Sequence, residues 1–304
     1  MSGSPRCDAL VIGASGQDGP YLIGAAERAG LKTWGTSRTV RSGAVVLDPT
    51  DRSAVAALLD EHRPARIFLL AGQSSVRRSY DCPAETFASH TQPVIACAEW
   101  MCSAGRETRL VYAASGECFG SRSADRPARE SDPFAPENPY ATAKAAGAML
   151  IRQYRRDFGL HCANAFLFNH ESPQRGADFV FGKLIAGLRE IQAGKRDEPV
   201  RLGNLSVRRD WGWAPDYAAA MLAMSELAQP EDLILATGHS VSLSEAVAAI
   251  VAASGLDMAA SVASSSVDTG GDAQFADPSL AAARIGWSGS TPFPALAELL
   301  VGPP

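Results

Sequence analysis

The 304-residue sequence predicts an α/β fold, with a doubly wound parallel sheet and a smaller mixed α/β lobe toward the C-terminus. Two observations predict it. Short apolar runs alternate with helical stretches through the first half of the chain, a pattern typical of parallel strands joined by right-handed crossovers. A glycine-rich turn also joins the first apolar run to the first helical stretch. We expect residues 1–168 to form the sheet domain, completed by a strand and a helix from about 214–238, and residues 169–304 to form mainly the smaller lobe.

Composition and charge narrow the classes of function. The chain is 46% hydrophobic, which supports a sizeable core, and its net charge is -5. This acidic balance gives no reason to expect a nucleic acid or an anionic membrane as a partner, although local Arg and Lys clusters still allow an anionic small ligand. The N-terminus lacks a basic region followed by a long apolar core. We therefore expect no signal peptide, no membrane span and a cytoplasmic protein.

The cysteines form no C-x-x-C pair and no Cys/His cluster with zinc spacing, so we expect no metal site and free thiols that are buried or partly buried. Cys118 lies beside Glu117, but the sequence offers no base that would activate it as a nucleophile. The six cysteines are Cys7, Cys82, Cys97, Cys102, Cys118 and Cys162.

The first strand and the first helix are predicted on either side of the turn GASGQDG. The apolar run Cys7 to Ile12 precedes this turn, and a helical stretch that ends at Gly30 follows it. Gly13 permits a tight turn, Gly16 lets backbone N–H groups approach a pyrophosphate, and Gly19 lets the helix pack closely on the strand. This arrangement predicts the dinucleotide-binding turn of a Rossmann-type fold, and a plain Gly-rich turn is the alternative. Its candidate cofactor-binding residues are Gly13, Ser15, Gly16, Gln17, Asp18 and Gly19.

The next two predicted strands favour NADP over NAD. An NAD site usually carries an acidic residue at the end of the second strand, but residues 32–38 end in Arg38, with Arg41 close by. Cations there suit the 2′-phosphate of NADP. The third strand, 44–48, ends in Asp48, a candidate partner for the adenine amino group. After a helix over 51–64 and a strand over 65–72, we expect Ala71 and Gln73 to pass close to the cofactor.

The candidate catalytic residues follow the fifth strand. Residues 84–105 predict a long helix that kinks or restarts at Pro93, and 109–115 predict the strand. Ser115 and Glu117 then lie at the carboxyl end of the sheet, where open α/β sheets place their sites. In the segment NPYATAK, Asn138 is a good N-cap and Pro139 suits the first helical position.

Tyr140 and Lys144 are four residues apart, and therefore lie one turn apart on one face of the predicted helix. A Lys ammonium beside a phenol favours phenolate, so we expect Tyr140 to act as a general base nearer neutral pH. The alternative is chance, because Y-x-x-x-K occurs in many helices.

The second half of the chain has a mixed pattern. Gly159 is expected to end the helix that carries Tyr140. A strand over 161–168 follows, and we expect Arg208 to begin a loop that leads into a helix ending near residue 228. Residues 264–275 are polar and are expected to be irregular. The other elements are helices over 178–194, 242–255, 277–287 and 293–302, and strands over 199–204 and 232–238.

Several longer segments resemble the GDP-mannose 4,6-dehydratases, a group within the extended short-chain dehydrogenase/reductase family. GQDGPYL is similar to the family's GQDGSYL turn, FNHESPQRG to its FNHESPxRG segment, and LGNLSVRRDWGWAPDY to its LGNxxxxRDWGxAxDY segment. ILATGHSVS and DPSLAAARIGW also resemble family segments. The resemblance covers most of the chain and implies a lyase of nucleotide-sugar metabolism that uses NADP and a GDP-sugar.

The resemblance also implies a mechanism. C4 of the sugar is oxidised by NADP+ while Tyr140, with Lys144, removes the proton of the C4 hydroxyl and Ser115 holds that hydroxyl. Glu117 takes the C5 proton while water leaves from C6, and the hydride returns to C6. For the substrate, the resemblance places Asn169, Lys183 and Arg209 near the nucleotide diphosphate, and Gly203 and Asn204 near guanine. His170 and Glu171 are interpreted as structural.

Three departures from the family leave alternatives open. The region after the second strand is short, which favours a homodimer over a tetramer. The family's Thr-Ser-Glu triplet is Ser115-Gly116-Glu117 in this chain. Its Arg-Pro-x-Glu segment is absent from residues 267–279, so either the substrate differs or another cation replaces the missing Arg. A reductase or epimerase acting on GDP-4-keto-6-deoxy-hexoses or related GDP-sugars is one alternative. A catalytically weak NADP-binding sensor is another.

Overall fold

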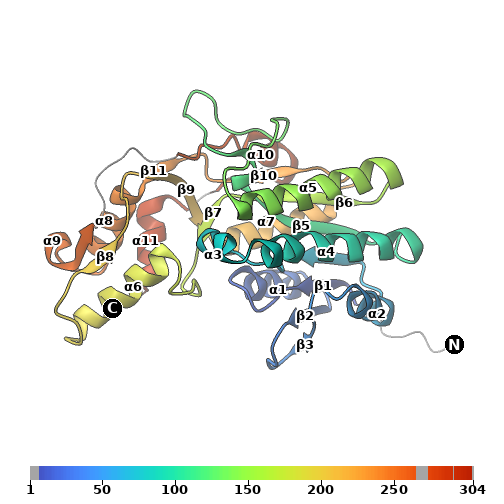
Figure 1. Ribbon diagram of the computed structural model, residues 1–304, viewed down its shortest axis with the longest axis horizontal. Helices are drawn as coiled ribbons and strands as arrows, with labels where there is room; N and C mark the ends of the chain where they lie inside the picture. The colour runs from blue at the N-terminus through green and yellow to red at the C-terminus, as the bar shows by residue number, and fades with distance from the viewer. Residues whose placement is uncertain (1–6, 265–272, 290, 303–304) are drawn as a thin grey trace.

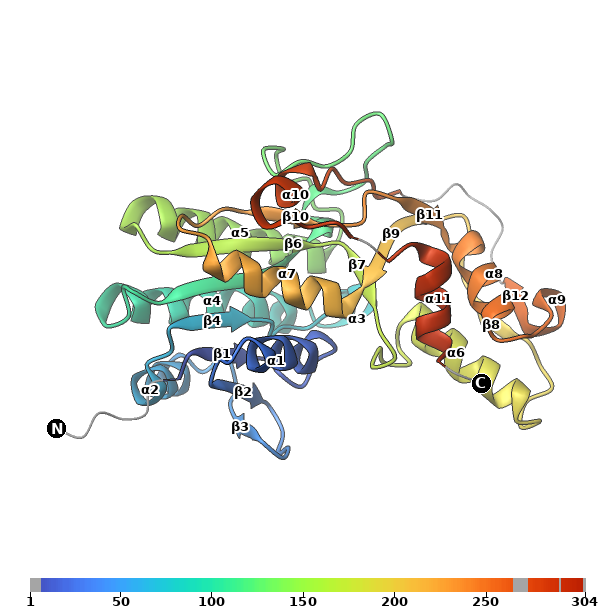
Figure 2. The same cartoon turned by 180° about the vertical axis from the view of Figure 1, so that it is seen from behind.

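The computed structural model describes residues 7–264, 273–289 and 291–302, and it confirms the doubly wound α/β fold (Figures 1 and 2). Seven parallel strands form the main sheet in the order β10-β6-β5-β4-β1-β2-β3. The order reverses between β1 and β4, which is the switch point where such sheets bind ligands. The strands are β1 Ala9–Ile12, β2 Thr33–Ser37, β3 Ala44–Val46, β4 Arg66–Leu69, β5 Arg109–Ser115, β6 Cys162–Leu167 and β10 Leu233–Leu235.

Helices cover both faces of this sheet. The layer nearer the viewer in Figure 1 contains α4 and α5, with α2 beside α4, and the opposite layer contains α1 and α7 (Figure 2). Short α3 lies between β4 and α4 in the chain, and a 3-10 helix, Gly116–Phe119, follows β5. The helices are α1 Asp18–Arg28, α2 Arg52–His62, α3 Val76–Asp81, α4 Pro83–Ser103, α5 Pro139–Phe158, α7 Ala214–Glu226 and α10 Ser279–Ile285.

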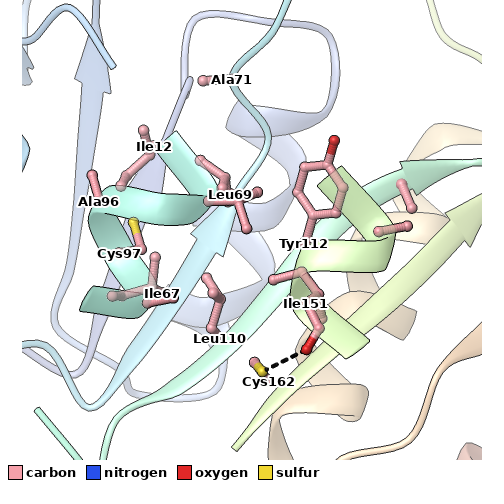
Figure 3. Packing of buried hydrophobic residues seen from close by; sticks show 14 of the residues in the cluster. Ile12, Ile67, Leu69, Ala71, Ala96, Cys97, Leu110, Tyr112, Ile151 and Cys162 are labelled. Carbon is pink, nitrogen blue, oxygen red and sulfur yellow. Dashed lines mark hydrogen bonds between the residues drawn. The ribbon is translucent and has the colours of Figure 1, made fainter. Parts of the chain in front are cut away.

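The central strands supply the core through their two-residue alternation. Leu10 and Ile12 of β1 pack on the α4–α5 side, whereas Ala9 and Val11 pack on the α1–α7 side, and all four are fully buried. Figure 3 shows the first of these two clusters, where Tyr112 lies among aliphatic side chains of neighbouring strands and of α4 and α5.

Three predictions concern the course and the ends of α4 and α5. The helix α4 runs through Pro93 without restarting, because the side chains around the proline are buried and this packing compensates for the missing backbone hydrogen bond. Asn138 caps α5 as predicted, since its side chain accepts a hydrogen bond from the Ala141 amide at 2.8 Å. Gly159 ends α5 in the left-handed conformation, with φ of 67°.

The smaller lobe has its own core, formed around Phe181, Trp211 and Phe293. The prediction of a loop from Arg208 is wrong, because residues 208–213 form a strand, β9, at the centre of a three-stranded sheet. β9 pairs with β7 on one side and β11 on the other, which a local pattern cannot show. The elements of the lobe are β7 Asn169–Glu171, α6 Val180–Gln192, β8 Val200–Leu202, β9 Arg208–Trp213, β11 Ser240–Ser242, α8 Leu243–Ala253, α9 Met258–Ser261, β12 Val262–Ser264 and α11 Phe293–Val301.

All six cysteines are free thiols, as predicted, and four of them are buried. Across the described ranges, none of the helices has the length and apolar character needed to cross a membrane.

The buried carboxylate of Asp232 connects the edge strand β10 of the main sheet to α5 and β6. Asp232, just before β10, accepts hydrogen bonds from Arg152 and Arg155 of α5, each at 2.7 Å, and from the Asn164 amide of β6 at 2.9 Å. Burial alone would raise the pKa of Asp232, but the hydrogen bond from Arg155 and the other donors hold it below its ordinary value. The charged form is therefore the one that stabilises this edge.

We expect Asp232→Asn to lower the free energy of unfolding by about 2–3 kcal/mol, because the substitution leaves two partly buried arginines without their shared counter-ion. Chemical denaturation at neutral pH measures this. The matched control is Asp157→Asn, which removes the exposed partner of Arg156 and should leave the denaturation midpoint unchanged. Equal effects of the two variants would contradict the structural role of Asp232.

Candidate active site

The glycine turn after β1 brings the backbone of two strands into close approach. Gly13 has φ of 94°, and a Cβ there would lie 2.6 Å from the backbone nitrogen of Ala71, after β4. No other residue type fits this position. α1 begins within the turn and packs at Gly19 against Ala14. The turn therefore leaves backbone at the N-terminus of α1 open to a ligand.

A cleft of about 450 Å³ lies over this turn at the carboxyl ends of the strands. Arg38 reaches it from the end of β2 and Asp48 from the segment after β3, as the sequence predicts, but Arg41 does not line it. Asp48 already accepts hydrogen bonds from the backbone and hydroxyl of Thr50, and these keep its pKa below the ordinary value. The predicted residues that the cleft brings together are Gly13, Ser15, Gly16, Arg38, Asp48, Ala71 and Gln73.

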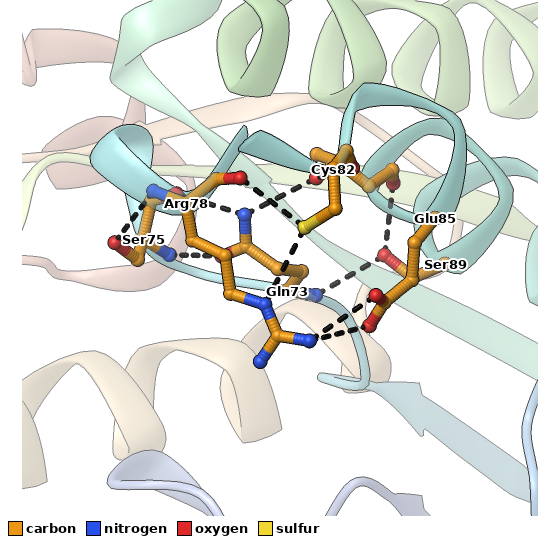
Figure 4. A network of polar contacts seen from close by, with 7 residues as sticks. Gln73, Ser75, Arg78, Cys82, Glu85 and Ser89 are labelled. Carbon is orange, nitrogen blue, oxygen red and sulfur yellow. Dashed lines mark hydrogen bonds and ion pairs between the residues drawn. The ribbon is translucent and has the colours of Figure 1, made fainter. Parts of the chain in front are cut away.

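The loop after β4 is held by its own polar contacts (Figure 4). The Gln73 amide donates to the Ser89 hydroxyl at 3.1 Å, and the Gln73 side chain donates to the Ser75 carbonyl at 2.8 Å. Arg78 of α3 forms an ion pair with Glu85 of α4 at 2.9 Å. The Gln73 side chain is thus occupied in shaping the loop that borders the cleft.

A second cleft, of about 360 Å³, adjoins the first one, and Leu70 and Gly72 line both. It contains all four candidate catalytic residues. β5 ends at Ser115, the following 3-10 helix carries Glu117, and the first two turns of α5 carry Tyr140 and Lys144. The sequence predicts Ser115 and Glu117 at the carboxyl end of the sheet and Tyr140 and Lys144 on one helix face, and the structure brings the two pairs into one cleft.

Burial dominates the electrostatics of the Tyr140–Lys144 pair. It raises the pKa of Tyr140 above the ordinary value, although a hydrogen bond with Ser115 works in the opposite direction. It also lowers the pKa of Lys144 to about 8. The Lys144 ammonium donates to the Ala113 carbonyl at 2.6 Å and lies 5.9 Å from the centre of the Tyr140 ring. The predicted lowering of the Tyr140 pKa is therefore not present in the protein alone, because desolvation outweighs the distant ammonium.

The carboxylate of Glu117 is held by two side-chain amides. Its Oε2 accepts from Asn138 at 3.1 Å, and its Oε1 accepts from Gln274 at 2.6 Å. Beside it, Cys118 is buried and burial raises the pKa of its thiol to about 12, so the structure opposes a nucleophilic role.

Sequence reasoning missed three residues at the site. His90 of α4 lines the second cleft 5.6 Å from the Tyr140 ring, and its Nδ1 is buried without a partner among the described residues. Arg175 lines the same cleft, and Gln274 contacts Glu117. Gln274 carries no local signal, because only the folded chain brings it to the strand ends. Arg175 is part of the FNHESPQRG segment, whose resemblance to the family could have marked it.

The dinucleotide turn and the smaller lobe meet through a charged cluster. His170 of β7 contacts Asp18 of α1 at 3.0 Å and stacks on Tyr217 of α7. Burial alone would raise the pKa of Asp18, but His170 holds it below its ordinary value. Gln17 donates to the His170 carbonyl at 2.9 Å, so the Gln17 side chain binds protein rather than lining the cofactor cleft. These contacts agree with a structural interpretation of His170.

The residues predicted for the substrate divide into two groups. Asn169 lines the second cleft. Lys183, Gly203, Asn204 and Arg209 lie in the smaller lobe and do not line it. The Lys183 ammonium donates to the Arg201 carbonyl at 2.7 Å, and the Asn204 side chain accepts from the Ser206 amide at 2.8 Å. Of the stretch that lacks the Arg-Pro-x-Glu segment, residues 267–272 lie outside the described residues.

Comparison with known proteins agrees with this architecture. The GDP-mannose 4,6 dehydratase family model matches residues 10–299. GDP-mannose 4,6 dehydratase 2 of Arabidopsis thaliana is 35% identical over 264 residues, which cover 78% of this chain and 70% of the relative. GDP-mannose 4,6-dehydratase of Vibrio cholerae is 33% identical over 257 residues, covering 77% and 68%.

Among solved structures, RMD from Pseudomonas aeruginosa complexed with NADPH is similar with a TM-score of 0.85 at 19% identity, covering 97% of each chain. This likeness bears on the fold alone. Because the family model spans nearly all of the sequence and the curated relatives exceed 30% identity, the chain belongs to the GDP-mannose 4,6-dehydratase family.

Proposed function

We propose that this protein is an NADP-dependent hydro-lyase that converts GDP-mannose, or a close GDP-hexose, to the 4-keto-6-deoxy sugar. The observation that carries the proposal is the position of Glu117. Its carboxylate shares one cleft with Ser115, Tyr140 and Lys144. A reductase or an epimerase on this fold needs the latter three, but water elimination needs a further group that moves a proton at carbon.

The first cleft fits a dinucleotide. Its floor is the turn at Gly13, where a side chain would collide with Ala71, and Arg38 provides a cation beside the Thr36 and Ser37 hydroxyls at the end of β2. This set suits a ribose 2′-phosphate better than a free 2′-hydroxyl. When bound, the cofactor would supply a hydride acceptor and a positive charge in the cleft in its oxidised form, and the hydride donor in its reduced form.

The proton of the C4 hydroxyl is removed by Tyr140, with the help of Ser115 and Lys144. Ser115 orients the C4 hydroxyl, and Tyr140 as phenolate accepts its proton while C4 becomes a ketone. The Lys144 ammonium, fixed on the Ala113 carbonyl, favours that phenolate. Tyr140 returns the same proton to C5 when C6 is reduced, so the residue ends each turnover as it began.

Glu117 performs the elimination between these two proton transfers. The C4 ketone acidifies the C5 hydrogen, and the carboxylate takes that proton. The C6–O bond then breaks, and the proton passes from Glu117 to the departing hydroxyl, which leaves as water. The net change is the loss of one water from the sugar, and no external reductant is consumed.

The smaller lobe would bind the nucleotide. Asn169 lies at the cleft wall, and Lys183 and Arg209 supply cations for a diphosphate, with Gly203 and Asn204 near the base. In this arrangement residues 1–168, with 214–238, bind the dinucleotide, and most of 169–304 binds the sugar nucleotide. A homodimer remains our proposal for the assembly, because the segment between β2 and β3 is short.

The proposal predicts that the protein, given GDP-mannose and a catalytic amount of NADP+, yields a product lighter by one water with the cofactor unchanged at the end. Mass spectrometry of the nucleotide sugar measures this. An unchanged sugar would contradict GDP-mannose as the substrate. Stoichiometric NADPH consumption with the 4-keto-6-deoxy sugar would instead establish the reductase.

Glu117→Gln should separate elimination from oxidation. We expect the rate of water loss to fall by about 10²–10⁴-fold, because the amide cannot carry the proton, while the absorbance of reduced nicotinamide still appears. Tyr140→Phe should abolish both signals. Glu137→Gln, an exposed carboxylate close by in the chain, is the matched control. Undiminished turnover of Glu117→Gln would exclude the proton-transfer role.

Arg38→Ala should lower the affinity for NADP+ by about 10- to 100-fold, because a charged hydrogen bond to the 2′-phosphate is lost, and should leave NAD+ affinity nearly unchanged. Calorimetric titration with each cofactor measures the two constants. Arg41→Ala is the matched control, since Arg41 does not line the cleft. Parallel losses for both cofactors would show that Arg38 does not select NADP.

A further inference from the structure

We propose that Gln274 is a positioning residue that orients the Glu117 carboxylate for proton transfer at the sugar carbon. This inference rests on the proposed function, in which Glu117 takes the C5 proton. Gln274 lies in the C-terminal segment just before α10, 157 residues from Glu117 in the chain. Nothing in the local sequence of that segment marks it as part of the site.

The geometry is that of a clamp on both carboxylate oxygens. Gln274 Nε2 donates to Oε1 of Glu117 at 2.6 Å, and Asn138 Nδ2 donates to Oε2 at 3.1 Å. An ionised carboxylate has about four acceptor positions, so two donors fix its plane and still leave acceptor positions for a substrate proton. Glu117 lines the second cleft, where that substrate would bind.

Gln274 can hold Glu117 because its own backbone is fixed on two sides. Its amide donates to the Arg208 carbonyl of β9 at 3.1 Å. The neighbouring carbonyls of Ala273 and Phe275 accept from Arg122 and Ala128 in the loop before α5, each at 2.8 Å. The Gln274 side chain is only 4% exposed, so little conformational freedom is left to lose.

A neutral amide side chain is suited to orienting a carboxylate that must act as a base. A Lys or Arg at position 274 would form an ion pair with Glu117 and make the carboxylate a weaker base. A carboxylate would repel it. The amide donates one hydrogen bond without competing for the proton that Glu117 must take, so it orients the base at small cost to its basicity.

The backbone hydrogen bond between Gln274 and β9 also links the Glu117 carboxylate to the smaller lobe. Arg208 and Arg209 lie on this strand, and β9 pairs with β7, which begins at Asn169. The strand proposed to bind the nucleotide diphosphate therefore also supports the residue that orients the base. Gln274 therefore connects β9, which is proposed to bind the nucleotide, with Glu117, which is proposed to act as the base.

The test is a double-mutant cycle with Gln274→Leu. Alone, this variant should lower kcat for water loss by about 10- to 100-fold, change KM for the sugar nucleotide less than twofold, and let reduced nicotinamide accumulate during turnover. In the Glu117→Gln background, the same substitution should have no further effect. Gln192→Leu, which removes an amide donor to Ser254 far from the cleft, is the matched control. Equal losses in both backgrounds, or a change confined to KM, would overturn the proposal.

A measurement without turnover separates this inference from the proposed function. In protein labelled with ¹⁵N-glutamine, the side-chain amide signal that Gln274→Leu removes should shift in Glu117→Ala and stay in place in Glu137→Ala. An unmoved signal would overturn the inference, whatever the enzyme does. If the wild-type protein removes no water from any GDP-hexose, the proposed function fails, and the shift alone still decides whether Gln274 holds Glu117. If Gln274→Leu does not fold, Gln274→Met, which keeps the length of the side chain and removes the donor, takes its place in the cycle and the assignment.

Discussion

The arrangement of the candidate catalytic residues depends on two hydrogen bonds of the Asn138 side chain. Its oxygen accepts from the Ala141 amide and so fixes where α5 begins. That start places Tyr140 and Lys144 one turn apart on the cleft wall. Its nitrogen donates to Glu117 in the 3-10 helix after β5. One side-chain amide therefore links Glu117 to the start of the helix that carries Tyr140, so the two residues proposed to move protons are positioned by the same helix cap.

Burial shifts the pKa of both residues of the Tyr140–Lys144 pair, in each case toward the neutral form. Lys144 is buried against β5, and burial lowers its pKa to about 8. Burial also raises the pKa of Tyr140. A further positive charge in the cleft would lower the pKa of Tyr140 and favour its phenolate. In the proposed mechanism a bound oxidised nicotinamide would supply that charge, so filling the first cleft would favour the proposed base in the adjoining one, with which it shares Leu70 and Gly72.

How far the sequence predicts this structure depends on how local each signal is. The glycine turn, the cap at Asn138, the stop at Gly159 and the strands of the main sheet follow from residues adjacent in the chain, and the structure confirms them. β9 was missed because its partners, β7 and β11, lie on either side of it in the chain and are each only three residues long. The contact between Gln274 and Glu117 spans most of the chain, and no periodicity or spacing reveals such a pair.

The departure at Ser115-Gly116-Glu117 has a local physical reason that bears on the sensor alternative. A Cβ at Gly116 would lie 2.7 Å from the ring of Phe168, which is 3% exposed and has no room to withdraw. In this structure the Phe168 ring would have to shift to admit a Cβ between Ser115 and Glu117. Phe168 belongs to the FNHESPQRG segment that resembles the family, so the glycine is the departure, and Ser115 and Glu117 on either side of it line the second cleft. A site that had lost its chemistry would have no physical need to keep Glu117 hydrogen-bonded from two elements, so the altered triplet does not favour the sensor alternative.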